Sequence, residues 1–401
     1  MIAIILPTGD PQSLSPLTEV ISESLLPIVN KPILEHQIEL LAQHGIKDIF
    51  VPLKHKPDQV TDYFGCGERW GVKLHFISIQ RYGGALNTLR EIQKQLIGPI
   101  LCIQGNVFSN PDVAQFIKVH EYGESDMTLC LPHELANSKS HGFLNDDLME
   151  KFPFIIESDL LRGKSKVTIE NPQDPDQNLF VPRFSIFSCK PSVRYLYMDS
   201  PESYWDINRR ILEKNVDEVI IKGKEISKGI WVGAHCEIHP KAKLKPPLVI
   251  GNHCVINKDA VLENGNVIGD HSIIEEGAFL TRSIVWKGTY VGTQTEIKDS
   301  IVNKNLLYNL PRKIMLKVTE SFLLGDSKPE FNFPKISTSK SGFLVKGNRL
   351  FAFPARLVDR IVITLNIFKA KIKLHKKTAG PIFLDSIAAS KQAKPKLGTK
   401  L

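Results

Sequence analysis

Two patterns of hydrophobic and polar positions follow one another along this chain, and the first covers its N-terminal half. Short apolar runs such as Ala3–Leu6 alternate with stretches of helical spacing such as Ile33–Gly45. Strand and helix in succession predict a parallel sheet with helices on both faces, an α/β domain that we expect over 1–222. Ligands bind such sheets at the carboxyl ends of the strands, so a site is expected on the loops there. The other runs are Asp48–Leu53, Lys73–Ile79, Ala85–Leu96, Pro99–Asn106 and Pro111–Glu121.

The second pattern has a period of six residues. An apolar pair recurs at each period from Val249 to Leu280, the spacing slips by about a residue, and the pairs resume at Ile284-Val285 and Tyr290-Val291. Repeats of an inward aliphatic residue and a turn residue are typical of a left-handed parallel β-helix, which we expect over 226–320. An ordinary β-sandwich is the alternative, but so regular a run is not expected by chance. The regular pairs are Val249-Ile250, Val255-Ile256, Val261-Leu262, Val267-Ile268, Ile273-Ile274 and Phe279-Leu280.

Length and composition agree with two globular domains and a tail. The 401 residues, 42% hydrophobic and 23% charged, exceed the usual single-domain size of roughly 100–200 residues. No run of about 18 apolar residues could span a bilayer. The first residues are apolar but lack a basic leader and a small-residue cleavage site, so we expect a buried first strand and a cytoplasmic protein. The six cysteines form no CxxC pair, which predicts reduced thiols in the core.

The net charge of +8 is concentrated near the C-terminus. Residues 343–401 carry 13 Lys and Arg against Asp359 and Asp385, a charge of +11, so the rest of the chain sums to 8 − 11 = −3. Outside this tail no basic stripe is interleaved with aromatic residues, and we therefore expect no nucleic acid as a partner.

The first 36 residues resemble the signature of the sugar-phosphate nucleotidyltransferases. That signature joins an apolar strand and a loop ending in Gly-Thr-Arg to Leu-x-Pro-Leu-Thr, Pro-Lys-Pro-Leu and Pro-Val-x-x-Lys-Pro. With the β-helix behind it, the chain resembles mannose-1-phosphate guanylyltransferases and glucose-1-phosphate nucleotidyltransferases over 1–320, which implies a Rossmann-like nucleotidyltransferase domain. The matching residues are Ile4, Ile5, Leu6, Gly9, Leu14, Pro16-Leu17-Thr18, Leu25, Pro27 and Asn30-Lys31-Pro32-Ile33.

The family's reaction joins two anions, because a sugar 1-phosphate attacks the α-phosphorus of a nucleoside triphosphate and displaces pyrophosphate. The resemblance implies backbone N–H groups around the phosphates, cations, and carboxylates that hold magnesium. At these positions the chain is degenerate. Ser13 stands where the phosphate-gripping Arg is expected, and Glu23 where the catalytic Lys is expected. Asn106 and Tyr197 stand at the two metal-carboxylate positions, with Asp199 two residues beyond the second.

The nucleotide and sugar motifs are half preserved. The phosphate loop keeps Gly9, but Pro7 and Pro11 have no N–H, and Asp10 would repel a triphosphate. By resemblance we expect a vestigial nucleotide site at Leu6, Gly9, Gly84, Ala85, Leu86 and Asn106, and a vestigial sugar site at Glu170, Asn171 and Arg183. The polar residues His55, Asp58 and Asp62 are expected on solvated helix faces.

Loss of one polar catalytic contact costs about 2.7–4 kcal/mol, so these substitutions favour a catalytically silent paralogue. Its expected role is regulation or scaffolding in nucleotide-sugar supply for envelope polysaccharide, without a cofactor. An active sugar-1-phosphate nucleotidyltransferase, which would need Mg²⁺, is the alternative. The resemblance implies a nucleotide or nucleotide-sugar ligand, and either self-assembly or assembly with an active paralogue. A β-helix acyltransferase is a third alternative, but we expect its candidate histidines at surface turns: His235, His239, His253 and His271.

After Pro311 the six-residue pattern stops, and 321–342 is expected to be a linker to the basic tail 343–401. Between Phe351 and Leu384 the tail weakly resembles the start of a bacterial phosphoglycosyl transferase, and we interpret it as a truncated remnant. Helical spacing followed by a lysine cluster suits either an anionic membrane surface or packing on the protein's own domains. The matching residues are Arg356, Leu357, Asp359, Ile372-Lys373-Leu374 and Gly380-Pro381-Ile382-Phe383, and the spaced apolar residues are Val358, Ile361, Leu365 and Phe368.

Overall fold

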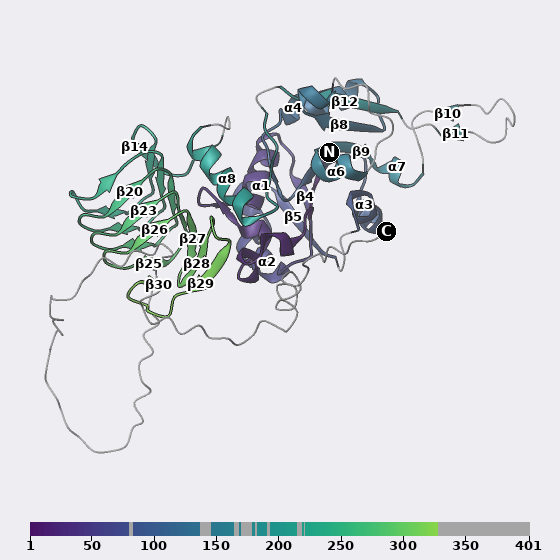
Figure 1. Cartoon of the computed structure of the whole chain (residues 1–401). Coiled ribbons are helices and arrows are strands. Elements are labelled where there is room, and N and C mark those ends of the chain that lie inside the picture. The colour runs from purple at the N-terminus through teal and green to yellow at the C-terminus, as the bar shows by residue number, and fades with distance from the viewer. Residues whose placement is uncertain are drawn as a thin grey trace, which may run out of the picture. The chain divides into compact units, whose positions relative to one another are not determined.

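The computed structural model contains an α/β domain followed by a stack of short parallel strands, as the two sequence patterns predict (Figure 1). The predicted tail and almost all of the predicted linker lie outside the residues that the structure describes. No helix in the described part of the chain is long and apolar enough to cross a membrane. The described residues are 1–79, 83–136, 146–163, 168–169, 179–180, 183–190, 193–214, 219 and 221–327.

A mixed sheet forms the centre of the α/β domain. In the described residues its order is β12-β8-β9-β6-β1-β4-β5, and β9 runs antiparallel to both of its neighbours. The inner strands are mostly apolar and buried because helices cover the sheet, whereas the edge strands β5 and β12 are partly exposed. Their bounds are β1 (Ile2–Leu6), β4 (Asp48–Leu53), β5 (Lys73–Ser78), β6 (Pro99–Gln104), β8 (Met127–Leu131), β9 (Phe154–Glu157) and β12 (Phe184–Ser188).

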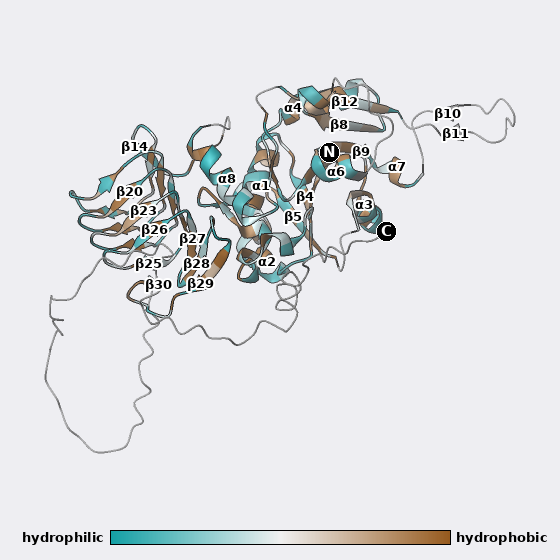
Figure 2. Ribbon diagram, in the orientation of Figure 1, coloured by the Kyte–Doolittle hydropathy of each residue, from teal (hydrophilic) through white to brown (hydrophobic). Residues whose placement is uncertain are grey.

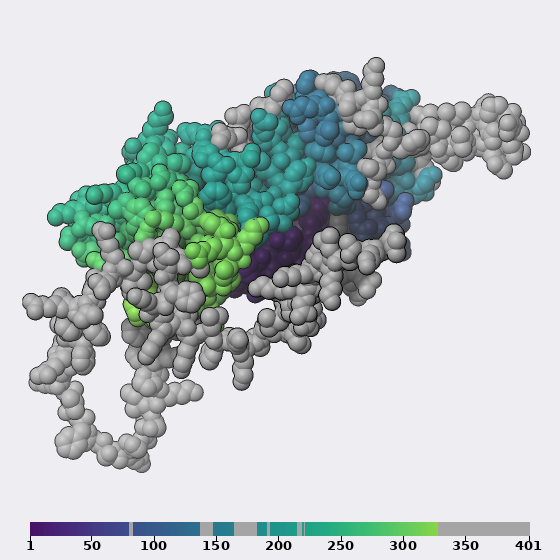
Figure 3. Space-filling model, viewed as in Figure 1, coloured from purple at the N-terminus to yellow at the C-terminus, as the bar shows by residue number. Residues whose placement is uncertain are grey.

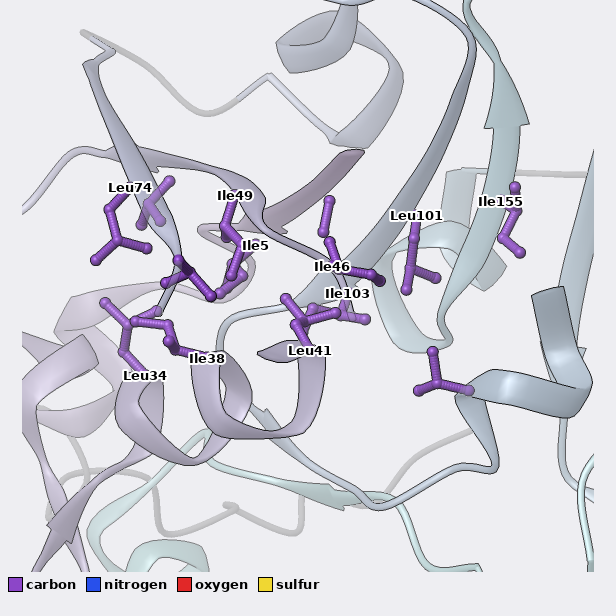
Figure 4. Close-up of a cluster of buried hydrophobic side chains, with 14 of the residues drawn as sticks. Ile5, Leu34, Ile38, Leu41, Ile46, Ile49, Leu74, Leu101, Ile103 and Ile155 are labelled. Atoms are coloured by element: carbon purple, nitrogen blue, oxygen red, sulfur yellow. The ribbon is translucent and has the colours of Figure 1, made fainter. Parts of the chain in front are cut away.

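Helix α1 (Ile33–Gln43) shows how sequence spacing makes this core. Leu34, Ile38 and Leu41 recur at i, i+4 and i+7, and Figure 4 shows them pointing toward aliphatic side chains of β1, β4 and β6. Gly45, with φ +77°, follows the end of the helix, where glycine in the left-handed region is common. The other helices are α2 (Pro57–Phe64), α3 (Ala85–Ile92), α4 (Val113–Tyr122), α5 (His133–Ala136), α6 (Asp146–Lys151), α7 (Ser158–Leu161) and α8 (Pro201–Leu212).

Short elements complete the α/β domain. The 3₁₀ helices are η1 (Pro11–Leu14), η2 (Leu17–Glu19), η3 (Glu23–Leu25), η4 (Glu68–Trp70) and η5 (Gln93–Gln95). The short strand pairs are β2 (Pro27–Ile28) with β3 (Lys31–Pro32), β7 (Val107–Phe108) with β13 (Leu196–Tyr197), and β10 (Thr168–Ile169) with β11 (Leu179–Phe180). Four of the six free cysteines are buried as predicted, whereas Cys236 is half-buried and Cys66 is exposed, because it lies in the turn after α2.

The strand registers give the coil length of the β-helix. Val249 pairs with Val267, 18 residues on, and Val267 pairs with Ile284, 17 residues on. One coil is therefore three six-residue units, and the slip in the sequence is a coil that is one residue shorter. Figure 2 shows hydrophobic and hydrophilic residues alternating through these strands. The second residues of the pairs stack fully buried inside the coils, as in the row Ile250, Ile268, Val285 and Val302.

Three parallel sheets form the sides of each coil. The first contains β15 (Ile230–Val232), β18 (Leu248–Ile250), β21 (Asn266–Ile268), β24 (Ile284–Val285) and β27 (Ser300–Asn303). The second contains β16 (Glu237–Ile238), β19 (Val255–Ile256), β22 (Ile273–Ile274) and β25 (Thr289–Val291), and the third β17 (Lys243–Leu244), β20 (Val261–Glu263), β23 (Phe279–Thr281) and β26 (Glu296–Lys298). Antiparallel strands flank them: β14 (Lys224–Ser227), β28 (Leu306–Asn309), β29 (Ile314–Lys317) and β30 (Leu324–Asp326).

The first β-helix sheet is apolar on its outer side as well. Its outward residues Val249, Val267 and Ile284 are buried in one hydrophobic cluster with residues of α8 and of the N-terminal segment. In Figure 3 green residues of the last strands lie against purple N-terminal residues. The β2–β3 hairpin adds a polar contact, because the Asn30 side-chain amide donates to the Ile268 carbonyl at 2.7 Å. The two domains therefore share a core.

Candidate functional site

The carboxyl edge of the central sheet brings Leu6 and Asn106 together. Leu6 is the register partner of Gln104, so the loops after β1 and β6 leave the sheet side by side. The backbone N–H groups of Thr8 and Gly105 both donate to the Leu6 carbonyl, at 2.8 and 2.7 Å. This is the edge at which the sequence predicts a site.

Asn106 is held by the preceding loop. Its side-chain Oδ1 accepts a hydrogen bond from the Thr8 hydroxyl at 2.5 Å. Its side-chain nitrogen approaches Gly9 so closely that a Cβ at Gly9 would lie 2.6 Å away, and Gly9 has φ +89°. The one side-chain oxygen of Asn106 is therefore already occupied within the protein.

The second metal position predicted from the resemblance, like the first at Asn106, lacks a carboxylate. Tyr197, which stands at this position by resemblance, lies opposite Val107, the residue next to Asn106. Its hydroxyl donates to the Lys151 carbonyl at 3.2 Å, and burial raises its pKa to about 12. Asp199 is exposed, and its carboxylate accepts from the Ser200 hydroxyl at 3.3 Å. A neutral amide and a neutral phenol are poor ligands for Mg²⁺, which prefers carboxylates.

Among the described residues no group of three His, Cys, Asp or Glu side chains is placed to hold a metal ion. Asn106 and Tyr197, which stand at the metal positions that the resemblance implies, do not fit magnesium, because neither side chain carries a carboxylate.

The loop after β1, which the resemblance assigns to phosphate binding, makes hydrogen bonds within itself. The Asp10 carboxylate accepts a hydrogen bond from the Gln12 N–H at 3.0 Å and so caps η1. The Ser13 N–H and hydroxyl both donate to the Asp10 carbonyl, at 2.9 and 2.6 Å. Donors that could face a phosphate are therefore directed to the loop's own acceptors.

Glu23, at the expected lysine position, has a basic partner. Its carboxylate lies 2.7 Å from Nδ1 of His55, and the two side chains are largely buried. The Ser22 hydroxyl also donates to the His55 carbonyl at 3.0 Å. The expectation that His55 lies on a solvated helix face is wrong, because it follows β4 in the loop before α2 and packs against Glu23. Asp58 and Asp62 are exposed on α2, as expected.

Glu150 contacts the start of α3, and the sequence analysis did not predict this contact. Gly84 and Ala85 begin α3, where free N–H groups and the helix dipole attract anions. The Ala85 N–H donates to the Glu150 carboxylate of α6 at 2.7 Å. Glu150 lies in no motif and 65 residues away in sequence, so only the packing of α6 on α3 places it there. Leu86 of the same motif packs against the core.

The structure does not bring the predicted sugar residue Arg183 to this edge. Arg183 precedes β12, which is parallel to β8, so it lies at the amino edge of the sheet. Its N–H donates to the Asp126 carboxylate at 2.9 Å, and its guanidinium lies 3.5 Å from Glu124. Glu170 and Asn171 lie outside the described residues.

The β-helix histidines lie on its surface, as expected. His235, His253 and His271 are exposed at turns with φ between 55° and 58°. Their rings stack on one another with centroids 5.0 and 4.9 Å apart. His239 is half-buried, and its ring accepts a hydrogen bond from the Lys241 N–H.

Comparison with known proteins agrees with this architecture. The family model "Nucleotidyl transferase" matches residues 2–180. The UTP–glucose-1-phosphate uridylyltransferase of Synechocystis is 24% identical over 270 residues, which cover 58% of this chain and 69% of that protein. The mannose-1-phosphate guanylyltransferase of Mycobacterium tuberculosis is 26% identical over 133 residues, 32% of this chain and 36% of that protein.

Among solved structures, one from Bacillus anthracis described as a candidate glucose-1-phosphate thymidylyltransferase covers 56% of this chain and 98% of its own. Its TM-score is 0.43 and its identity 16%. Residues 2–180, a little under half of the chain, are therefore similar to the nucleotidyl transferase family.

Proposed function

We propose that this protein is a catalytically silent member of the nucleotidyl transferase family, with a regulatory or scaffolding role in the supply of nucleotide sugars. The observation that carries the proposal is the Asn106 side chain, whose oxygen accepts the Thr8 hydroxyl where the family chemistry needs a metal-binding carboxylate. An amide held in this way supplies no negative charge to bridge two phosphates through magnesium.

Two further contacts support the same proposal. Glu23 brings a negative charge to the expected lysine position and pairs with His55, so this position supplies no cation to neutralise a leaving pyrophosphate. Glu150 occupies the Ala85 N–H at the start of α3. Each of these interactions would have to be broken before a triphosphate could be gripped in the expected way.

The ligand that we propose is a nucleotide or a nucleotide sugar, because relatives are named for uridylyl and guanylyl transfer to sugar 1-phosphates. The Gly84-Ala85-Leu86 segment remains to contact a base. The proposed partners are further copies of this chain or an active paralogue, and the proposed location is the cytoplasm.

A pyrophosphate-release assay tests silence directly. The purified protein is incubated with each nucleoside triphosphate, glucose or mannose 1-phosphate, and Mg²⁺, beside an active relative as positive control. We expect no release above the reaction without metal. Turnover that disappears in Asn106→Ala would establish the alternative, an active transferase with atypical residues.

Binding and assembly are tested separately. Thermal-shift titrations with UDP-glucose and GDP-mannose measure ligand binding, and co-elution with an active paralogue measures assembly. If the protein is inactive and shows neither ligand binding nor co-elution, the proposed regulatory or scaffolding role is contradicted.

A further inference from the structure

A cavity of about 590 Å³ lies between the N-terminal segment and the β-helix. Pockets of this size hold drug-sized ligands, so it has room for two aromatic side chains. Much of its wall is apolar, and Val20 and Tyr63 at this cavity are 43% and 37% exposed. The apolar and aromatic lining residues are Val20, Ile21, Leu25, Pro27, Tyr63 and Trp286.

The described chain ends at this cavity. Asp326, the last residue of β30, forms an ion pair with Lys304 at 2.5 Å, and Lys304 lines the cavity. The Ser327 N–H donates to the Gly288 carbonyl at 2.9 Å, next to Lys287, another lining residue. The Ser327 hydroxyl is buried and has no hydrogen-bond partner among the described residues. Ser327, the last described residue, therefore lies beside lining residues of the cavity.

The sequence that follows is suited to enter an apolar groove. It reads Lys328-Pro329-Glu330-Phe331-Asn332-Phe333-Pro334. Proline favours extended backbone for itself and its predecessor. In an extended chain residues i and i+2 point to one side, so Phe331 and Phe333 would share a face. Phe331 is four residues beyond Ser327, a reach of about 14 Å.

We propose that the segment Lys328–Pro334 docks in this cavity and inserts Phe331 and Phe333 between the two domains. The lining also includes Gln59, whose side chain accepts a hydrogen bond from the Ser22 N–H at 2.9 Å. Docking would thus tie the β-helix to the segment that presents Glu23. The proposal does not depend on whether the protein is catalytically silent.

A second copy of the same pattern supplies a matched control. Phe351-Ala352-Phe353-Pro354 repeats the Phe-x-Phe-Pro spacing 20 residues later. Its longer tether lowers its effective concentration at the cavity roughly 15-fold, because closure probability falls as the three-halves power of length. The nearer copy is therefore the expected occupant.

Cross-linking of the full chain tests the proposal. In a Cys66→Ser background, which removes the exposed thiol, Asp62→Cys at the cavity and Asn332→Cys in the segment are joined with a short bismaleimide. We expect a cross-link within one chain, mapped by mass spectrometry. Lys47→Cys, exposed at the amino edge of the sheet, replaces Asp62→Cys as the position control and should cross-link at least tenfold less.

Alanine pairs then identify the anchor. Phe331→Ala with Phe333→Ala should abolish the cross-link, and Phe351→Ala with Phe353→Ala should leave it unchanged. Equal cross-linking to position 47, a cross-link between two chains, no cross-link, or loss only with the second alanine pair would each overturn the proposal. Unchanged circular dichroism in every variant excludes loss of folding as the cause.

Discussion

The Tyr204 hydroxyl accepts a hydrogen bond from the Trp286 indole N–H at 3.0 Å and donates one to the Pro27 carbonyl at 2.8 Å. The two rings meet edge to face, with centroids 6.4 Å apart. Tyr204 is fully buried, and burial raises its pKa well above the ordinary value, so it remains a donor. One hydroxyl therefore joins helix α8, the β-helix and strand β2.

Tyr204→Phe tests this junction. The ring is kept, but the Trp286 N–H and the Pro27 carbonyl lose their partner at a largely buried junction. A buried group left unpaired costs about 1–3 kcal/mol, so we expect a lower urea midpoint. Tyr122→Phe is the matched control, because Tyr122 is 87% exposed, and it should shift the unfolding free energy by less than about 0.5 kcal/mol. Equal effects of the two changes would show that the junction adds no stability.

The inward rows of the β-helix predict a sharp difference between neighbours. Ile274 is fully buried inside the coil, whereas Ile273, beside it on β22, is partly exposed outside. Ile274→Ala should destabilise the fold by about 2–5 kcal/mol because it leaves a cavity. Ile273→Ala should cost clearly less. Chemical denaturation measures both, and the reverse ranking would contradict the inward assignment.

The β-helix could be predicted from sequence because its signal is local. Each coil repeats the same pair, so inward residues such as Ile250 and Ile274 follow from period alone. The outward side of the first sheet could not be predicted in this way. Val249 and Val255 are equivalent in the repeat, yet Val249 is buried and Val255 is not, because the α/β domain covers one side of the coil.

In the candidate site, too, some features follow from local sequence and others only from tertiary contacts. Motif positions such as Gly9 and Asn106 follow from the strand order and meet at the carboxyl edge. The side chains that contact the site come from residues far away in the sequence, and no sequence pattern predicts these contacts. His55 reaches Glu23 across 32 residues and Glu150 reaches Ala85 across 65, so only the folded chain shows that the site is occupied by its own side chains.

Gly9→Ala probes the contact with Asn106. The change places a Cβ 2.6 Å from the Asn106 amide nitrogen and forces alanine to φ +89°. Strained backbone costs about 1–3 kcal/mol, and the overlap adds to it. Gly45→Ala is matched, because Gly45 has φ +77° but nothing within 4 Å. We expect the larger loss of unfolding free energy for Gly9→Ala, and combining it with Asn106→Ala should cost less than the sum of the single changes. Equal losses of unfolding free energy at Gly9 and Gly45 would show that the Asn106 side chain moves away from the new Cβ without a measurable cost.

Glu35 predicts a dependence of stability on pH. Burial raises the pKa of this carboxyl, but hydrogen bonds from Lys222 and Tyr63 outweigh burial and lower its pKa below the ordinary 4.5. An acid with a depressed pKa stabilises the fold above its unfolded value and loses that contribution as pH falls through the folded value. Glu35→Gln should therefore lower stability at pH 7 and flatten the decline below pH 4.5.

Urea unfolding from pH 3 to 7 measures this effect. The exposed Glu121→Gln provides the baseline, because it removes one carboxylate from the surface. Parallel curves for Glu35→Gln and the unchanged protein would show that the pairing with Lys222 adds no pH dependence.

Glu150→Ala should open the start of α3 to a ligand. The change releases the Ala85 N–H and removes a negative charge beside the helix dipole, so an anionic nucleotide sugar would meet a donor instead of a carboxylate. We expect at least about tenfold tighter binding, equivalent to about 1.4 kcal/mol, in calorimetric titration with UDP-glucose or GDP-mannose. Glu91→Ala removes an exposed charge from the same helix and should leave affinity within about twofold. Weaker binding in Glu150→Ala would mean that the carboxylate contacts the ligand itself, for instance through sugar hydroxyls, and that the start of α3 is part of a working site rather than a blocked one.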